Sequence, residues 1–335
     1  MTQLATFLRT VWHPEGGHAL GAGSFEGWYF KVVSSDLRHK WALIPGIFRG
    51  VDGADEAFVQ VLDGTNGRSW YHRFPASEFS AAATGVDIRV GPHHFSSTGF
   101  TVDFPEFAGQ VRFTSPLDPW PITPLSPGVM GWYSWVPSME CYHGVCSFGH
   151  ALAGSVRLAE GEVADFAGGR GYMEKDWGQA FPAGYLWLHA NTFANSDASL
   201  MASVALIPWR GREFRGFIVG LRESGRLHRF ATYTGARSEQ LQLTDDHLTW
   251  TLRSRLGIPG RPRTTLTLQA ERRSGGLLHA PIRTEMHKRV EETMNSRVEV
   301  TLRVGREVVY ADTADAACLE VHGETDRLLA TSERR

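Results

Sequence analysis

Hydrophobic and polar side chains alternate along much of the chain, and this period of two residues predicts β-strands. Successive side chains of a strand point to opposite faces, so the alternation indicates one buried and one solvated face. Turn sequences rich in Asp, Asn, Ser and Gly separate these stretches. The clearest alternating stretches are residues 86–90, 100–104, 111–113, 241–243, 248–252, 266–268 and 298–304. The pattern predicts an all-β protein of antiparallel strands, for which closed barrels are a natural way to remove sheet edges.

Helical periodicity is scarce. Residues 3–12 fit one helical turn or two, and residues 286–295 have helix-favouring content but lead directly into an alternating stretch. The proline-rich segment 116–128 lacks several backbone donors, so we expect a crossing loop there. Glycine and tryptophan are abundant, at 36 and 11 residues, which favours short strands, bulges and tight turns.

The chain has 335 residues, a length that suggests two domains. Residues 158–163, with the sequence LAEGEV, resemble a connector. We therefore expect an N-terminal β domain over residues 1–155 and a C-terminal β domain over residues 156–335.

Composition excludes several classes of protein. The formal net charge of −2 gives no overall attraction to nucleic acid, and no apolar run is as long as a membrane-spanning helix. The first residues, MTQLATFLRTVWHPEGG, lack the apolar core and cleavage site of a secretory signal. The three cysteines, Cys141, Cys146 and Cys318, do not make a disulfide framework. A cytoplasmic location is the expectation.

Two segments concentrate acidic and aromatic side chains. In GSFEGWYFK, residues 23–31, a strand would place Glu26 and Trp28 on one face. The segment 128–145 then brings an acid, a histidine and four rings into twelve residues: Trp132, Tyr133, Trp135, Glu140, Tyr142 and His143.

A third segment, GYMEKDWGQAFP, spans residues 171–182. On a strand, Glu174 and Asp176 share one face, and their closeness would let one keep its proton while the other is ionised. The opposite parity would turn Lys175 and Trp177 toward a ligand instead.

The available chemistry is that of carboxylates, histidine and aromatic rings, because no nucleotide, zinc-protease or serine-hydrolase motif is present. We therefore expect no cofactor and no metal. These groups suit protonation of an electron-rich alkene. Burial or a second carboxylate can keep the acid protonated, and ring faces stabilise the resulting cation by about 0.5 to 2 kcal/mol each. Each group also has a structural interpretation, since strand carboxylates often form ion pairs and clustered rings often fill cores.

The three segments together resemble the tocopherol cyclase family. The resemblance lies in FEGWYFK (25–31), MGWYSWVPSMECYHGV (130–145) and GYMEKDWGQAFP (171–182). Weaker matches are IPGIF (44–48), FVQVLDG (58–64) and RVEETMNSRVEVTLR (289–303). One departure is visible, because the family's third motif typically reads EKNWG and Asp176 here replaces the asparagine.

The resemblance implies two lipocalin-like antiparallel β-barrel or sandwich modules around an apolar cavity. It also implies an acid that protonates a prenyl double bond, after which a hydroxyl traps the cation. The carboxylates and histidine carried over as catalytic candidates are Glu174, Asp176, Glu140, His143 and Glu26. The candidate substrate-binding residues are Trp28, Tyr29, Trp132, Tyr133, Trp135, Tyr142, Trp177, Trp187 and His189.

Three functions stay open at this point. The first is a cofactor-independent cyclase acting on a prenylated aromatic or terpenoid substrate. The second is a hydratase that adds water to an isoprenoid double bond, and the third is a non-catalytic carrier of an apolar molecule. The expected partner is an apolar small molecule, with no nucleic acid, and a transient membrane contact is left open.

Overall fold

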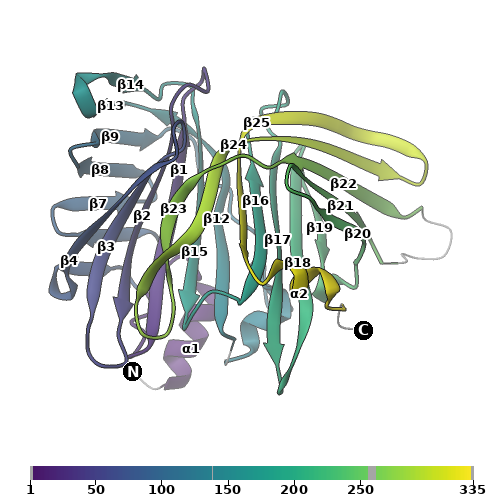
Figure 1. The fold of residues 1–335 in the computed structure, drawn as a ribbon, viewed down its shortest axis with the longest axis horizontal. Coiled ribbons are helices and arrows are strands. Elements are labelled where there is room, and N and C mark those ends of the chain that lie inside the picture. The colour runs from purple at the N-terminus through teal and green to yellow at the C-terminus, as the bar shows by residue number, and fades with distance from the viewer. Residues whose placement is uncertain (1–2, 138, 256–261, 333–335) are drawn as a thin grey trace. The chain divides into compact units, whose positions relative to one another are not determined.

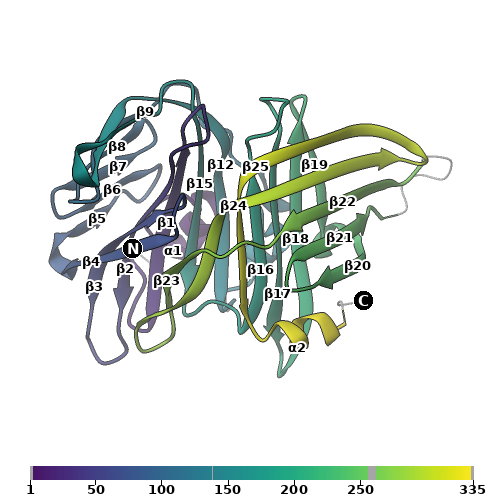
Figure 2. The same cartoon turned by 45° about the horizontal axis from the view of Figure 1, so that its top comes forward.

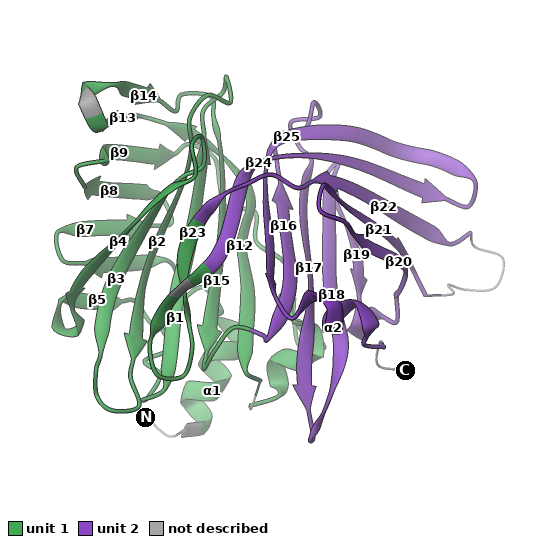
Figure 3. Cartoon of the chain, viewed as in Figure 1, with its two compact units in different colours: residues 1–181, 277–289 green, residues 182–276, 290–335 purple. Residues whose placement is uncertain are grey.

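The computed structural model describes residues 3–137, 139–255 and 262–332, and nearly all of their regular structure is β-strand (Figure 1). This confirms the predicted all-β class. The chain forms two compact units (Figure 3). Unit 1 comprises residues 1–181 and 277–289, and unit 2 comprises residues 182–276 and 290–335.

Unit 1 contains an antiparallel sheet with the strand order β4-β3-β2-β1-β15-β12-β9-β8-β7-β6-β5, and the β13–β14 hairpin pairs with β9. Figure 2 shows β5 to β9 as a series of short neighbouring strands. The strands are β1 (Ser24–Val33), β2 (Lys40–Arg49), β3 (Glu56–Asp63), β4 (Arg68–Pro75), β5 (Phe79–Ala81), β6 (Asp87–Val90), β7 (His93–Ser96), β8 (Gly99–Asp103), β9 (Phe107–Phe113), β10 (Ile122–Thr123), β11 (Ser126–Pro127), β12 (Cys141–Ala153), β13 (Ser155–Leu158), β14 (Val163–Asp165) and β15 (Arg170–Gly178). The helical pieces are α1 (Gln3–Trp12) and the 3-10 turns η1 (Ala76–Glu78), η2 (Gly131–Trp135) and η3 (Ala159–Gly161).

Unit 2 is built on a second antiparallel sheet, with the order β19-β18-β17-β16-β25-β24-β22-β21-β20, and β23 pairs with β24. The strands are β16 (Gly184–Ala190), β17 (Ser199–Trp209), β18 (Arg212–Glu223), β19 (Arg226–Ala231), β20 (Arg237–Leu243), β21 (His247–Arg253), β22 (Thr264–Glu271), β23 (Gly276–Pro281), β24 (Met286–Val304) and β25 (Glu307–Gly323). The helical pieces are η4 (Thr232–Thr234) and α2 (Thr325–Ala330). Residues 277–281 of β23 and 286–289 of β24 belong to unit 1.

Each unit has its own hydrophobic core. In unit 1, Trp28 and Phe30 of β1 pack with Met173 of β15 and with apolar side chains of β6 to β9. In unit 2, Trp250 of β21 packs with apolar residues of β16 to β18, β22, β24 and β25. Burying apolar surface on one face of each sheet is the main favourable contribution to folding.

The alternating stretches lie where the sequence predicts strands. In β6, for example, Ile88 and Val90 are buried while their neighbours are exposed. The central strands behave differently, because nearly every residue of β1, β15 and β16 is buried. Both of their faces are covered, so these strands carry no simple alternation.

The chain passes from unit 1 to unit 2 between Phe181 and Pro182, later than the expected boundary at residue 155. The reason is that β15 pairs with β1 and β12, which keeps residues 170–178 in the sheet of unit 1. Residues 158–163 are the turn of the β13–β14 hairpin rather than a connector.

Residues 3–12 form the helix α1, as expected, and residues 286–295 are strand throughout. Residues 116–128 cross as a loop with a small β10–β11 hairpin. Among the described residues, none of the helices has the length and apolar character that crossing a membrane requires.

Candidate active site

The third motif forms β15, which lies between β1 and β12 in the sheet of unit 1. Pairing with β12 places His143 opposite Asp176 and Val145 opposite Glu174. Because side chains alternate along a strand, Tyr172, Glu174 and Asp176 share one face of β15. His143 projects on the same face, so backbone register brings an imidazole between two carboxylates.

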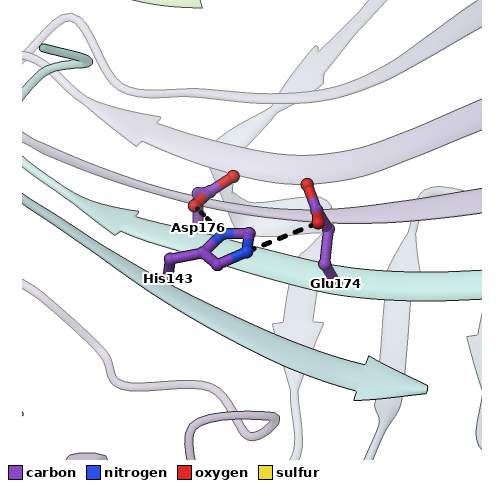
Figure 4. A group of neighbouring side chains, drawn as sticks. All are labelled: His143, Glu174 and Asp176. Carbon is purple, nitrogen blue, oxygen red and sulfur yellow. Dashed lines mark hydrogen bonds and ion pairs between the residues drawn. The ribbon is translucent and has the colours of Figure 1, made fainter. Parts of the chain in front are cut away.

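The three side chains make direct polar contacts (Figure 4). His143 Nδ1 is 2.8 Å from Asp176 Oδ1, a hydrogen-bond distance. His143 Nε2 is 3.5 Å from Glu174 Oε2. On the other side of Glu174, the Tyr172 hydroxyl donates a short hydrogen bond to the same oxygen, Oε2. A continuous polar chain therefore runs from Tyr172 through Glu174 and His143 to Asp176.

Burial decreases toward one end of this chain. The side chain of Glu174 is 6% exposed, that of His143 14% and that of Asp176 25%. Tyr172 is fully buried. Neither carboxylate is mainly exposed, so neither belongs to a solvated strand face. Asp176 is the member that water reaches most easily.

The charges of the group are strongly coupled. Burial opposes the charged form of His143, but the neighbouring charges of Glu174 and Asp176 outweigh it and raise the imidazole pKa to about 9. His143 is therefore an imidazolium at neutral pH. Burial, together with the charge of Glu174, raises the pKa of the Tyr172 phenol well above its usual range. Tyr172 consequently stays protonated and remains a hydrogen-bond donor.

Lys175 projects from the opposite face of β15 and is completely buried. Its ammonium lies 2.8 Å from Glu26 Oε2 and 3.4 Å from His18 Nδ1, and it donates to the backbone oxygen of Gly16. Glu26 Oε2 also accepts the backbone N–H of His18, at 2.8 Å.

Glu26 is thus placed with Lys175 and not with the other candidate carboxylates. Burial alone would raise the pKa of Glu26, but the charge and hydrogen bond of Lys175 lower it below its usual range. The pKa of His18 falls to about 3, through burial and the charge of Lys175, so His18 is neutral. The cluster is a buried ion pair with its hydrogen-bonding partners satisfied.

Two predicted wall residues lie against this ion pair, and a third stacks on one of them. The Lys175 ammonium lies 4.3 Å from the ring centre of Trp28 and 5.1 Å from that of Trp177. Tyr142 stacks on Trp177 with 5.4 Å between ring centres. Tyr29 is the predicted wall residue on the other face, where its ring centre is 6.4 Å from that of Tyr172.

The remaining aromatic candidates of unit 1 lie in η2. Trp132 and Tyr133 stack at 4.0 Å, with Trp132 40% exposed and Tyr133 buried. Trp135 packs against Phe7 and Trp12 of α1. Trp135 therefore packs the loop after β11 against the N-terminal helix.

Glu140 directly precedes β12 and is half-buried. Burial raises its pKa, although the charges of Arg283 and Arg289 act in the other direction. It has the environment of a protonatable carboxyl but lies outside the His143–Asp176 hydrogen bond. Trp187 and His189 belong to β16 of unit 2, where both are buried and their rings stack at 6.3 Å.

A family model described as tocopherol cyclase-like matches residues 105–323, more than half of the chain. The chain belongs to the tocopherol cyclase-like family. The match contains β12 and β15, and therefore the whole polar chain from Tyr172 to Asp176. This confirms the resemblance that the sequence motifs indicate.

Curated relatives agree with the family. A probable chloroplastic tocopherol cyclase of Oryza sativa subsp. japonica is 24% identical over 269 residues, which cover 64% of this chain. The chloroplastic tocopherol cyclase of Zea mays is 23% identical over 277 residues, or 65% of the chain. The matches span only 57% and 58% of the length of these two relatives.

Solved structures share the fold at low sequence identity. The crystal structure of CghA with Sch210972 has a TM-score of 0.55 at 13% identity, covering 90% of this chain and 88% of CghA. A putative AttH protein from Nitrosomonas europaea has a TM-score of 0.53 at 13% identity, covering 92% of this chain and 94% of that protein.

The same group also has the composition of a metal site in this tocopherol cyclase-like chain. His143, Glu174 and Asp176 offer ligand atoms within 4.8 Å of one another. The imidazole, however, presents one nitrogen to each carboxylate, so its ring already separates the two acids. An ion bound to both carboxylates would have to displace this pairing.

Sequence reasoning missed Tyr172, Lys175 and His18 as members of these clusters. Tyr172 was detectable, because it lies two residues before Glu174 and so shares its strand face. Lys175 follows from the same parity, on the opposite face. His18 carried no signal, since it comes from a loop whose place in the sheet the sequence does not reveal.

Proposed function

We propose that this protein is a cofactor-independent cyclase that protonates a double bond of a prenylated aromatic or terpenoid substrate. The observation that carries the proposal is the Tyr172–Glu174–His143–Asp176 chain, which combines buried acids with an end open to water. Membership of the tocopherol cyclase-like family supports the same reaction class.

Glu174 is the proposed acid, because it is the more buried carboxylate and its Oε2 accepts from Tyr172. A proton passes from the His143 imidazolium to Glu174 Oε2 and from there to the alkene. It forms a new C–H bond with the π electrons of the alkene, which becomes a tertiary carbocation. A substrate hydroxyl oxygen attacks the cation and closes the ring. The proton released by that hydroxyl replaces the one that the alkene gained.

His143 and Asp176 return protons to Glu174. The imidazole contacts both carboxylates, so the group can lose a proton at one end and regain it at the other. Asp176, at the exposed end, exchanges protons with water. The overall reaction is an isomerisation, which consumes neither a cofactor nor a net proton.

The remaining parts of the proposal concern the ligand site. We place an apolar cavity beside the face of Tyr29 and Tyr172, within lipocalin-like modules. The two phenol rings are suited to stabilise a cation there by about 0.5 to 2 kcal/mol each. The substrate is the proposed apolar partner, and the enzyme class is an intramolecular lyase or other isomerase.

Product mass tests the proposal. The purified protein is incubated with prenylated hydroquinones and terpenoid alkenes, and extracts are compared by mass spectrometry with those from Glu174→Gln/Asp176→Asn. We expect an isobaric product that the double variant does not make, while Glu140→Gln serves as the matched control and retains activity. A product heavier by one water would replace the cyclase with a hydratase. An apolar molecule recovered unchanged from both proteins would replace it with a carrier.

A further inference from the structure

The buried Glu26–Lys175 ion pair lies on the face of β15 opposite the proposed acid group. Both side chains are almost fully inaccessible, at 3% and 0% exposure. A buried ion pair is not required for stability, because hydrophobic residues of similar size in its place often stabilise a fold equally well. Lys175 lies between Glu174 and Asp176 in the sequence, so a change in its position would also move the backbone of both carboxylates.

The pairing of β12 with β15 explains why such an anchor is needed. The register shifts between Val145 and Ser147, where a bulge interrupts the ladder. The pairing of β12 with β15 on the far side of the bulge therefore does not determine the register of residues 141–145. A slip of one residue there would turn His143 to the other face, away from Asp176.

A chain of contacts connects the ion pair to this short segment. The Lys175 ammonium lies over Trp177, and the neutral His18 ring meets the same indole edge-to-face, with 4.6 Å between ring centres. Trp177 in turn stacks almost parallel on Tyr142, at an angle of 8°. Tyr142 directly precedes His143. Fixing the Trp177 ring therefore fixes the backbone that carries the imidazole.

We propose that Lys175 is a positioning residue, which acts with Glu26 through Trp177 and Tyr142 to hold His143 against Asp176. This inference rests on the proposed function for its effect on catalysis, but the geometry that it predicts can be measured without any substrate.

The test uses Lys175→Met/Glu26→Gln, which removes both charges together and leaves no unpaired buried ion. NMR titration of histidine-labelled protein follows the His143 signal, assigned by its loss in His143→Gln. We expect the pKa of His143 to fall by about one unit or more from about 9, toward 6.5, because its carboxylate partners are held less closely. With a substrate, we expect kcat to fall about tenfold to hundredfold at nearly constant KM.

The matched control is Glu106→Gln, which removes a carboxylate that is equally buried in unit 1 and pairs with His72 at 2.6 Å. It should leave the His143 titration unchanged. If the double variant does not fold, Tyr142→Leu removes the ring that stacks on Trp177 without leaving an unpaired ion, and it should still lower the His143 pKa. A folded variant in which His143 titrates as in the wild type would overturn the positioning role. Absence of any product from the wild type would overturn the proposed function and leave this measurement valid.

Discussion

Glu174 and Asp176 are two residues apart on one strand face, yet their surroundings differ. Glu174 is nearly inaccessible and is bonded to a buried phenol, whereas a quarter of the Asp176 side chain is exposed. Two carboxylates in unequal environments can take different roles in proton transfer. In the proposed reaction, the buried carboxylate passes the proton to the substrate and the more exposed one exchanges protons with water.

Single substitutions should reveal this division. Glu174→Gln should lower kcat by about 10² to 10⁴, because the amide cannot deliver a proton. Asp176→Asn should cost less, about tenfold, since water can still reach His143. Steady-state turnover checks both, with Glu140→Gln as a control expected near wild type. A loss in Glu140→Gln with full activity in Glu174→Gln would assign the acid to the residue before β12.

The raised pKa of His143 makes stability depend on pH. Folding favours the imidazolium, so this contribution is complete below the unfolded pKa of 6.5 and is lost as the pH rises through about 9. The difference between the folded and unfolded pKa values of His143 corresponds to about 3 kcal/mol in the free energy of unfolding. Urea unfolding of wild type and His143→Gln should show a stability difference that shrinks by this order between about pH 6 and about pH 10.

The groups facing His143 are Glu174 and Asp176, and their charges favour the imidazolium. The same deprotonation removes the proton carrier, so kcat should fall as the pH passes about 9. Parallel stability curves for the two proteins would contradict the ion pairing of His143.

At the scale of elements, β15 is a strand with two different polar faces. One face carries the acid group and the other carries the Lys175 cluster. Its end is set by Gly178, which has a φ of 150°. A Cβ there would lie 2.3 Å from the backbone oxygen of Glu140 and 3.0 Å from the Cα of Cys141. Only glycine lets β12 approach this closely.

Gly178→Ala should therefore destabilise the protein by about 3 kcal/mol, through backbone strain and displacement of β12. Gly161→Ala is the matched control, because Gly161 also has a positive φ, of 86°, but open space around it. It should cost about 1 kcal/mol. Denaturant unfolding measures both. Equal losses would show that the close approach at Gly178 is not what the glycine provides.

At the scale of the whole molecule, the chain has two β units with separate hydrophobic cores. The family match over residues 105–323 includes parts of both units. In the proposed reaction the substrate and the chain supply every atom and proton. We therefore expect activity to be unchanged after dialysis against a chelator. Loss of activity on chelation, with recovery on adding one divalent metal, would instead assign His143, Glu174 and Asp176 as ligands.

The sequence by itself determined the β class, through alternation in strands such as β6 and β21 whose two faces differ in burial. It also determined the family, because three motifs rich in rare residues coincide with β1, β12 and β15 or the segments beside them. Strand parity predicted that Glu174 and Asp176 share a face. Each of these follows from local properties of the chain.

Only the tertiary structure decided which carboxylates meet. His143 pairs with Asp176, 33 positions away, and Glu26 pairs with Lys175, 149 positions away. Both pairings depend on the register between strands that are distant in the sequence. The strands β1 and β15 show no hydrophobic–polar alternation because both of their faces are buried. The sequence therefore does not indicate on which face of the sheet a polar residue lies. The boundary between the units was decided in the same way, since β15 joins the first sheet by pairing and not by its place along the chain.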